Sequence, residues 1–361
     1  MFRRMNSSLS LTQFRQVFQP RLKIFWQKKQ QMYAALIPDT TLQSFLAYPS
    51  TLMESGGKRL RPYLLYLLYK MAGGRNDAAI IDLSISLELF HNFALIHDDI
   101  IDRGETRHGI LTTHRMITQQ LAKEKRTEDR EHIGEGQAML LGDILLVLAF
   151  EHLSTAKGIS RERRDAAYPY LTTLAQEVII GQMLDVDGMK KAFVSDDIVF
   201  QKTFLKTATY SFIHPMHIGV ALAGDIPLLL DFSDRFGTAL GLAFQLQDDL
   251  FDLTSSASVL QKTVFSDLRE GQHTYFTQYI STHGTSAQKK TLKKFFGKPV
   301  TEKDRSVIHA LFTETGALDA GITVMETFFD GAEKLLAELR VPAKKKERLH
   351  ELLKNIRDRQ Q

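Results

Sequence analysis

The sequence predicts an all-α protein with one main domain, and three observations support this fold class. Apolar residues recur at helical spacing through most of the 361 residues. No stretch alternates apolar and polar residues over the length of a strand, and no Asn-Gly or Asp-Gly pair joins two β-branched runs. The breaks marked by Gly, Asp or Pro are too short to be domain linkers. A hydrophobic content of 43% is sufficient for a large core.

The helices are expected in order from their start and stop residues. Pro62 suits a first helical turn and the pair Gly73-Gly74 ends that helix. The next stretch contains neither Gly nor Pro and reads as one uninterrupted helix. We assign residues 1–36 to an N-terminal helical segment or extension and residues 37–361 to the main domain. The expected helices are 60–74, 78–102, 137–153, 166–185, 195–222 and 232–254, with several more after 288. Residues 122–135 and 254–274 are expected to be irregular.

Composition excludes several classes of function. The net charge of +4 is a slight surplus over a large chain, so charge gives no reason to expect a nucleic-acid partner. The absence of cysteine excludes disulfides, thiol nucleophiles and thiolate metal sites, and it fits a reducing compartment such as the cytoplasm. No apolar run reaches the roughly 18 residues of a membrane span, so no transmembrane segment is expected. The basic, hydroxyl-rich N-terminus predicts an amphipathic first helix, with an organellar presequence as the alternative.

Two acidic motifs follow apolar helices at the same internal spacing. Asp98 and Asp102 are four residues apart and therefore lie on the same face of a helix, where like charges repel. The pattern recurs 150 positions later at Asp248, Asp249 and Asp252. A hard cation such as Mg²⁺ that bridges carboxylates and a phosphorylated ligand would offset the repulsion. The repetition therefore predicts two Asp-Asp-x-x-Asp motifs that face one cavity and bind a diphosphate through several Mg²⁺ ions.

Basic residues accompany the acidic motifs, as a diphosphate site requires. One group follows a glycine pair just before a helix start, where backbone N–H groups also favour anions. Others follow the first motif, lie between the motifs or follow the second. The candidates are Lys58, Arg59, Arg61, Arg103, Arg107, Lys202, Lys206 and Lys262.

From Gly56 to Thr274 the chain resembles the trans-type polyprenyl diphosphate synthases, the farnesyl/geranylgeranyl diphosphate synthase family. The resemblance is carried by "GGKRLRP", "HNFALIHDDIID", Arg107, "GEGQAMLLGD", "GQMLDVD", "KTATYSF", "FQLQDDLFD" and "KTVFSDLREG", which come in family order. It implies that 37–361 is a catalytic domain, an antiparallel helical bundle around a central cavity, in a homodimer. The implied reaction joins isopentenyl diphosphate to an allylic diphosphate.

The resemblance also implies roles for individual residues. Three Mg²⁺ ions would be held by Asp98, Asp102, Asp248 and Asp252. Arg107, Lys206 and Lys262 would stabilise the leaving diphosphate, and Thr207 and Gln245 the allylic carbocation. Isopentenyl diphosphate would be bound by Lys58, Arg61, His91, Arg107 and His108.

The sequence departs from the family pattern at two places. His108 stands where an arginine is usual, and a histidine is mostly neutral at pH 7 unless an anion raises its pKa. We expect weaker and more pH-dependent binding of isopentenyl diphosphate; an equal pH dependence of its KM in His108→Arg would contradict this. Gln272-His273 replaces a common Gly-Lys pair, with an effect that the sequence does not define.

Product length is expected to depend on the side chains four and five residues before Asp98. Ala94 is small and Phe93 is bulky, a pattern that resembles geranylgeranyl-length (C20) enzymes, and the floor lies roughly 6 to 8 Å along the helix from Asp98. Phe90 is a candidate second stop, although ordinary core packing explains Phe90 better.

Four alternatives remain open from the sequence. A farnesyl (C15) product and a longer product both fit the same motifs. A class I terpene cyclase also uses Mg²⁺ and aspartates, but its second motif differs. A regulatory, non-catalytic subunit of a heteromeric synthase would be expected to lose aspartates that this chain keeps.

Overall fold

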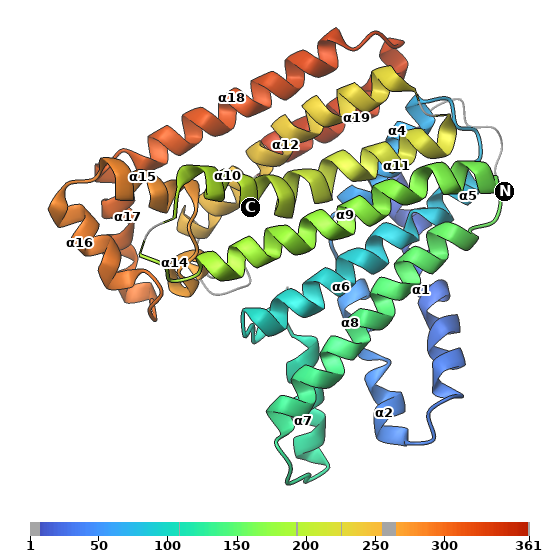
Figure 1. Cartoon of the computed structure of the whole chain (residues 1–361), viewed down its shortest axis with the longest axis horizontal. Coiled ribbons are helices and arrows are strands. Elements are labelled where there is room, and N and C mark those ends of the chain that lie inside the picture. Colours follow the sequence, from blue (N-terminus) through green and yellow to red (C-terminus); the bar gives the residue numbers. More distant parts are fainter. Residues whose placement is uncertain (1–7, 108, 193, 225, 255–264, 360–361) are drawn as a thin grey trace. The chain divides into compact units, whose positions relative to one another are not determined.

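The computed structural model describes residues 8–107, 109–192, 194–224, 226–254 and 265–359, and its described residues form two compact units. The first unit contains residues up to Pro169 together with Ile218–Asp225, and the second contains the remainder. Almost all regular structure is helical, which confirms the predicted all-α class (Figure 1). The predicted boundary after residue 36 stays a prediction. In the structure, the N-terminal helix shares a unit with the helices that follow it.

The first unit contains ten elements in chain order, plus the start of α9 and the end of α11. They are α1 (Leu11–Ala34), α2 (Thr40–Phe45), α3 (Tyr48–Glu54), α4 (Leu60–Met71), α5 (Asp77–Leu83), α6 (Ile85–Ile101), β1 (Thr106–Arg107), β2 (Ile110–Leu111), α7 (Thr113–Lys123) and α8 (Arg130–Thr155).

The second unit is built around α12. Its elements are α9 (Arg161–Gly188), α10 (Asp196–Thr203), η1 (Phe204–Ile213), α11 (His214–Ala223), α12 (Pro227–Thr254), α14 (Ser266–Glu270), α15 (Tyr275–His283), α16 (Ser286–Phe295), η2 (Glu302–Asp304), α17 (Arg305–Glu314), α18 (Ala317–Glu338) and α19 (Ala343–Arg357), where α9 and α11 are shared with the first unit.

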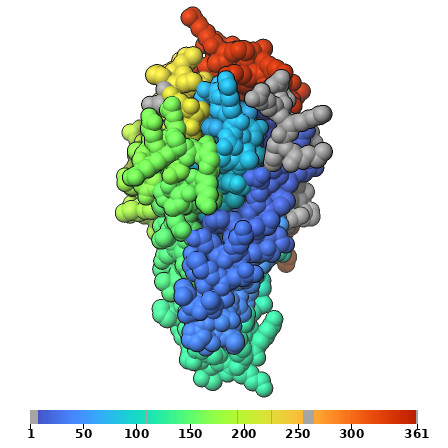
Figure 2. All heavy atoms as spheres, turned by 90° about the vertical axis from the view of Figure 1, so that its right-hand side faces the viewer, coloured from blue at the N-terminus to red at the C-terminus, as the bar shows by residue number. Residues whose placement is uncertain are grey.

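The core of the first unit holds the N-terminal helix α1 in place. Ser10 caps α1, and the Phe14 ring lies 5.3 Å from the Tyr63 ring and 5.4 Å from the Tyr66 ring of α4. Burial of an aromatic side chain contributes about 1.5–3 kcal/mol, so this contact ties α1 firmly to α4. The amphipathic first helix predicted from the sequence is present. Figure 2 shows the N-terminal helices beside the α7 region, and Figure 1 shows α6 beside α8.

The second unit positions η1 closely against its neighbours. η1 is a ten-residue π-helix that packs along α12, and α12 also packs along α18 (Figure 1). A Cβ at Gly181 would lie 2.8 Å from the backbone nitrogen of Lys206, and one at Gly241 would lie 2.5 Å from the Cα of Ala208. Both glycines are therefore needed for α9 and α12 to approach η1 so closely.

Four local expectations from the sequence were wrong. The predicted helix 78–102 is interrupted at Ser84, whose hydroxyl donates to the Ile81 carbonyl at 2.8 Å and so competes with helical bonding. The predicted helix 195–222 contains the π-helix η1. A two-stranded hairpin, β1–β2, occurs where no strand was expected. Within 254–274, the short helix α14 is present.

Two helical stretches of the described chain are long and apolar enough to cross a membrane by composition alone. They are Asp77–Ile101, whose apolar window is 78% buried, and Arg130–Thr155, whose window is 39% buried. Core helices of folded proteins pass the same test, so a membrane-spanning segment is not supported.

Candidate active site

The first aspartate motif ends α6 and is held by one arginine. The hairpin β1–β2 places Arg107 so that its Nε donates to Asp99 at 2.8 Å and its Nη2 donates to Asp98 at 3.2 Å. Asp102 caps the helix C-terminus, with its backbone N–H bonded to the Asp98 carbonyl at 2.9 Å. Asp98 and Arg107, predicted to act together, are thus brought together by the structure.

The carboxylates of this motif differ in their environment. Desolvation by burial raises the pKa of Asp99 above its ordinary value, although the charge of Arg107 and its hydrogen bond lower it. Burial lowers the pKa of Arg107, but the charges of Asp99, Asp98 and Asp102 outweigh this and raise it. The Asp98 side chain remains 24% exposed and therefore accessible to a ligand from solvent.

The start of α4 is fastened to α6 by a buried ion pair. Arg59 pairs with Glu88, and its side chain also bonds the Met53 carbonyl. Arg59 adopts a left-handed φ of 54° directly before α4, after a glycine pair. Arg59 therefore positions its neighbours Lys58 and Arg61 near α6. His91 is three residues after Glu88 and lies on the same face of α6.

The second aspartate motif is at the end of α12 and uses different partners. Asp248 pairs with Arg359 near the C-terminus. Asp252 is 3% exposed; its Oδ1 accepts from the Ser266 N–H at 3.0 Å and the Ser266 hydroxyl at 2.7 Å. Its Oδ2 accepts from the Asp267 N–H at 3.1 Å, so Asp252 caps α14. A metal-ligand role for Asp252 stays a prediction.

Asp249 of the second motif is also buried and is 8% exposed. Desolvation raises its pKa to about 7; the hydrogen bond from Gln245 and the charge of Lys202 lower it, and the charges of Asp248 and Asp252 raise it. The Gln245 amide donates to Asp249 at 2.7 Å, and its carbonyl accepts from the Thr207 hydroxyl at 2.6 Å. Thr207 and Gln245, both predicted site residues, therefore contact each other, and Asp249 orients the amide.

Two lysines share the buried carboxylate Asp185, which is 4% exposed. Lys206 lies 2.5 Å and Lys202 lies 3.0 Å from its two oxygens. Burial raises the pKa of Asp185, but the charges and hydrogen bonds of Lys206 and Lys202 outweigh burial and lower it below its ordinary value. Asp185 therefore holds both ammonium groups in place on α10 and η1.

The departure at Gln272 and His273 supports this lysine pair. Lys202 donates to the His273 carbonyl at 2.8 Å and lies 3.5 Å from the Gln272 side-chain oxygen. The His273 ring nitrogen bonds the Lys191 carbonyl at 3.0 Å. In this chain, the side-chain oxygen of Gln272 and the backbone carbonyl of His273 orient Lys202, and the pair does not supply a further cation.

The predicted product floor is part of the α6 core. Phe93 is 7% exposed, and its ring lies 5.3 Å from the Phe90 ring and 4.6 Å from the His97 ring. Phe90 is fully buried, whereas Ala94 is partly exposed. Phe90 therefore supports Phe93 from within the core. The roles of both residues in product length stay predictions.

Two predicted site residues, His108 and Lys262, lie outside the described residues. Within the described ranges, no group of three or more His, Asp or Glu side chains is placed to hold a metal ion without other ligands. The residues nevertheless fit a hard cation that is also bound by phosphate oxygens. In each motif the first aspartate is accessible and carries a positive side chain, Arg107 or Arg359.

Sequence reasoning gave no role to several members of the site, although it placed Asp249 in the second motif. Asp99, Asp185 and Asp249 position other groups, and only their burial distinguishes them from solvated acids. Arg359 lies 107 residues after Asp252, and no spacing rule links the two. Asp185 lies in the segment "GQMLDVD", which resembles the family, and this resemblance could have identified it as a site residue.

The sequence and fold match known proteins over most of the chain. Residues 43–314 match the family model Polyprenyl synthetase. A geranylgeranyl diphosphate synthase of Methanosarcina mazei is 31% identical over 83% of this chain and 86% of its own length. A geranylfarnesyl diphosphate synthase of Aeropyrum pernix is 29% identical over 85% of this chain and 92% of its own.

Among solved structures, a geranylgeranyl pyrophosphate synthase from Corynebacterium glutamicum, complexed with isoprenyl diphosphate and magnesium, is similar with a TM-score of 0.90. It is 28% identical, and the match covers 98% of this chain and 100% of that one. With the aspartate motifs and their cations in place, these matches establish that the chain belongs to the polyprenyl synthetase family and is a prenyltransferase.

Proposed function

We propose that the chain condenses isopentenyl diphosphate with an allylic diphosphate and releases mainly geranylgeranyl diphosphate. The observation that carries this proposal is the pair of lysines on Asp185, with Thr207 and Gln245 next to Lys206. Such a site binds a diphosphate through fixed cations and presents neutral oxygens beside it. Neutral oxygens stabilise an allylic cation without capturing it as a strong nucleophile would.

Mg²⁺, which we propose as three ions per site, would be held by Asp98, Asp102 and Asp248 and would neutralise charge on the allylic diphosphate as it leaves. Arg107 and Lys206 are proposed to bind the same diphosphate; Asp98, Asp99 and Asp102 raise the pKa of Arg107, and Asp185 pairs with Lys206. Lys262 is proposed to join them. Because these cations are already held in place, little reorganisation is needed as the carbon–oxygen bond breaks.

Isopentenyl diphosphate is proposed to bind Lys58, Arg61 and His91, with His108 in place of the usual arginine. The Arg59–Glu88 ion pair supports this by keeping the start of α4 beside α6. The double bond then attacks the allylic cation held near Thr207 and Gln245. The departed diphosphate is the proposed acceptor of the proton that the product loses.

The test is an assay of the purified chain with isopentenyl diphosphate, an allylic starter and Mg²⁺, followed by separation of products by length. We expect a C20 product from the full chain. Absence of condensation would favour the regulatory-subunit alternative, a cyclic hydrocarbon would favour the cyclase, and C15 or C25 products would change the length assignment.

The proposed floor is tested by Phe93→Ala. Removing this ring should lengthen the main product by at least one five-carbon unit, because Phe90 then becomes the next barrier. Phe90→Leu is the matched control, since it alters the same aromatic contact from the core side. Unchanged length in Phe93→Ala would remove Phe93 as the floor.

A homodimer is also proposed, with α8 in the interface. Met139, Leu140 and Val147 lie along one side of this helix and are 46%, 58% and 65% exposed. Such an apolar surface is typical of an interface between subunits. Light scattering should give a dimer for the wild type and a monomer for Leu140→Glu/Val147→Glu.

A further inference from the structure

The C-terminal end of α19 is fastened to the helices around the second aspartate motif. The guanidinium of Arg357 pairs with three acids on one face of α18, and its backbone carbonyl accepts from the Gln247 side chain of α12 at 3.1 Å. The three acids are Glu326, Asp330 and Glu333. Arg357 therefore holds the end of α19 beside Gln247, the residue before Asp248.

Arg359, two residues after Arg357, contacts the second aspartate motif directly. Its guanidinium pairs with Asp248, and its central carbon lies 4.7 Å from the centre of the Phe251 ring and 5.4 Å from that of Phe244. The Arg359 side chain is 19% exposed, whereas that of Asp248 is 44% exposed. Asp248 therefore remains open to solvent on the side that Arg359 leaves uncovered.

An arginine on this carboxylate competes with a divalent ion for the same oxygens. A partly exposed ion pair contributes little to stability, so a metal–diphosphate complex can displace it. The two aromatic rings keep the guanidinium close after displacement through cation–π attraction. Since Arg357 already anchors α19, release of Arg359 does not require the helix to detach.

We propose that Arg359 is a tethered counter-ion that occupies Asp248 in the metal-free enzyme and is replaced when a divalent metal binds. We call Arg359 the latch, because its ion pair with Asp248 forms when no metal is bound to the second motif and breaks when a metal binds there. This inference rests on the proposed role of Asp248 as a metal ligand.

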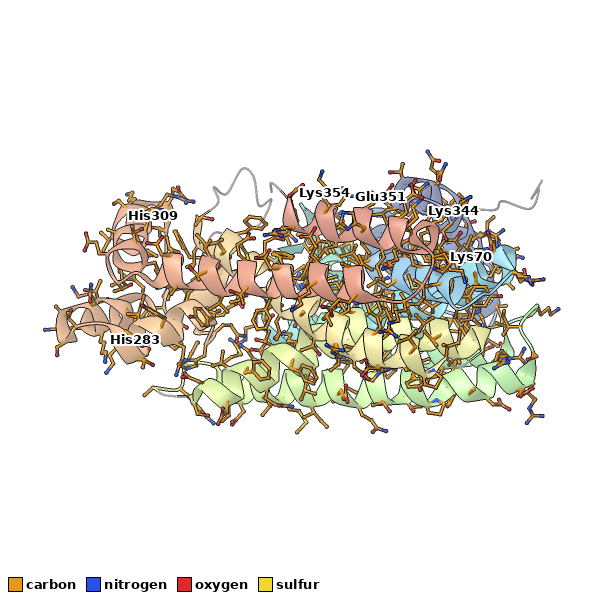
Figure 3. All side chains as sticks on the ribbon, turned by 90° about the horizontal axis from the view of Figure 1, so that it is seen from above. Lys70, His283, His309, Lys344, Glu351 and Lys354 are labelled. Carbon is orange, nitrogen blue, oxygen red and sulfur yellow. The ribbon has the colours of Figure 1, made fainter. Side chains whose placement is uncertain are left out.

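Metal affinity gives the first test and requires no turnover. Mn²⁺ titrations followed by electron paramagnetic resonance should give roughly two- to five-fold tighter binding in Arg359→Gln than in the wild type, because the competitor is removed. Lys354→Gln removes the same charge from an exposed position on α19, seen in Figure 3, and should leave the affinity unchanged. Equal affinities in all three chains would overturn the latch.

The mobility of the C-terminus gives the second test. The chain has no cysteine, so Asp358→Cys provides a single site for a nitroxide label. Added Mg²⁺ should make the label more mobile in the otherwise unchanged chain, while Arg359→Gln should be mobile before Mg²⁺ is added. If Mg²⁺ does not change the mobility of the label in the otherwise unchanged chain or in Arg359→Gln, the proposal is wrong.

Failure of the latch and failure of the metal assignment are distinguishable. If Asp248→Asn weakens Mn²⁺ binding but Arg359→Gln has no effect, the latch is wrong and the proposed function stands. If Asp248→Asn leaves Mn²⁺ binding intact, Asp248 is not a ligand, and both the latch and that part of the proposed function fall.

Discussion

The two Asp-Asp-x-x-Asp motifs share a sequence pattern but differ in what holds each carboxylate. In the first, a single arginine bridges Asp98 and Asp99. In the second, the corresponding pair is divided between Arg359 on Asp248 and the neutral Gln245 amide on Asp249. Among the described residues, the middle aspartate of the first motif thus bonds to a cation, whereas that of the second bonds to a neutral amide, and the charge of Lys202 acts on it without a hydrogen bond. Identical spacing therefore leads to different protonation behaviour.

The largest expected effect tests whether the motifs are equivalent in catalysis. Asp98→Asn and Asp248→Asn should each lower kcat/KM on the order of 10²- to 10³-fold, as loss of a preorganised electrostatic group does. Asp165→Asn, an exposed acid of α9, is the control and should leave kcat/KM unchanged. If kcat/KM falls less than tenfold in Asp248→Asn alone, the first motif contributes more to catalysis than the second.

The arginine bridge of the first motif is tested by Arg107→Lys. The lysine keeps the charge but cannot reach both carboxylates with a planar fork, so kcat should fall roughly 10- to 100-fold. Arg115→Lys is matched, because Arg115 also pairs with two acids, Glu105 and Glu131, at the surface. Similar losses in the two variants would argue against a special role for the bridge.

The buried middle aspartates differ in their effect on stability with pH. Between the unfolded pKa of 3.8 and the folded value of about 7, folded Asp249 holds a proton that the unfolded chain has lost. Its contribution to stability is therefore present at low pH and is lost as the pH rises to about 7. Asp249→Asn should therefore become more stable than the wild type as the pH rises from 4 to 8, by roughly 1 to 4 kcal/mol in the free energy of unfolding. Denaturant unfolding in the presence of EDTA measures this difference.

Asp99→Asn sharpens the comparison. The pKa of Asp99 is also raised by burial, so the gain should have the same sign, but the opposing charge of Arg107 should make it smaller. A larger gain for Asp99→Asn than for Asp249→Asn would contradict the difference drawn between the motifs.

The smallest expected effect concerns the last aspartate of the second motif. In Asp252→Asn an amide NH₂ faces one of the N–H donors of α14, so the free energy of unfolding should fall by about 1 kcal/mol. Mn²⁺ affinity should change little if the described hydrogen bonds are its main role. A strong loss of Mn²⁺ binding with unchanged stability would restore Asp252 as a metal ligand.

The helices were predictable because their apolar periodicity is local. α4 starts at the expected residue 60 and ends at Met71 instead of 74, and α12 ends at the expected Thr254 but starts at Pro227 instead of 232. The break at Ser84 and the π-helix η1 were not predictable, since each depends on a competing bond or on packing between helices. Gly181 and Gly241 permit the close packing of η1, yet in the sequence they resemble any other helical glycine.

The candidate site was predictable where charged residues repeat and unpredictable where burial decides. Asp98, Arg107, Lys206, Thr207 and Gln245 were identified from motifs, and the structure gives them mutual or shared partners. The pKa of Asp249 depends on burial, and the use of Asp252 as a cap depends on the fold of the following segment. Neither property is encoded in the spacing of the acids.

The π-helix η1 makes the chain sensitive to length at one place. A π-helix holds more residues per turn than an α-helix, so deletion of one residue within Phe204–Ile213 would allow the ordinary helix to re-form. The wider turns take up the extra residue without turning the flanking helices, so the deletion would leave α10 and α11 in register and would shift only the side chains within η1. A loss of one amino acid there would reposition the Lys206 and Thr207 side chains relative to α11, while the composition of the site stayed nearly the same.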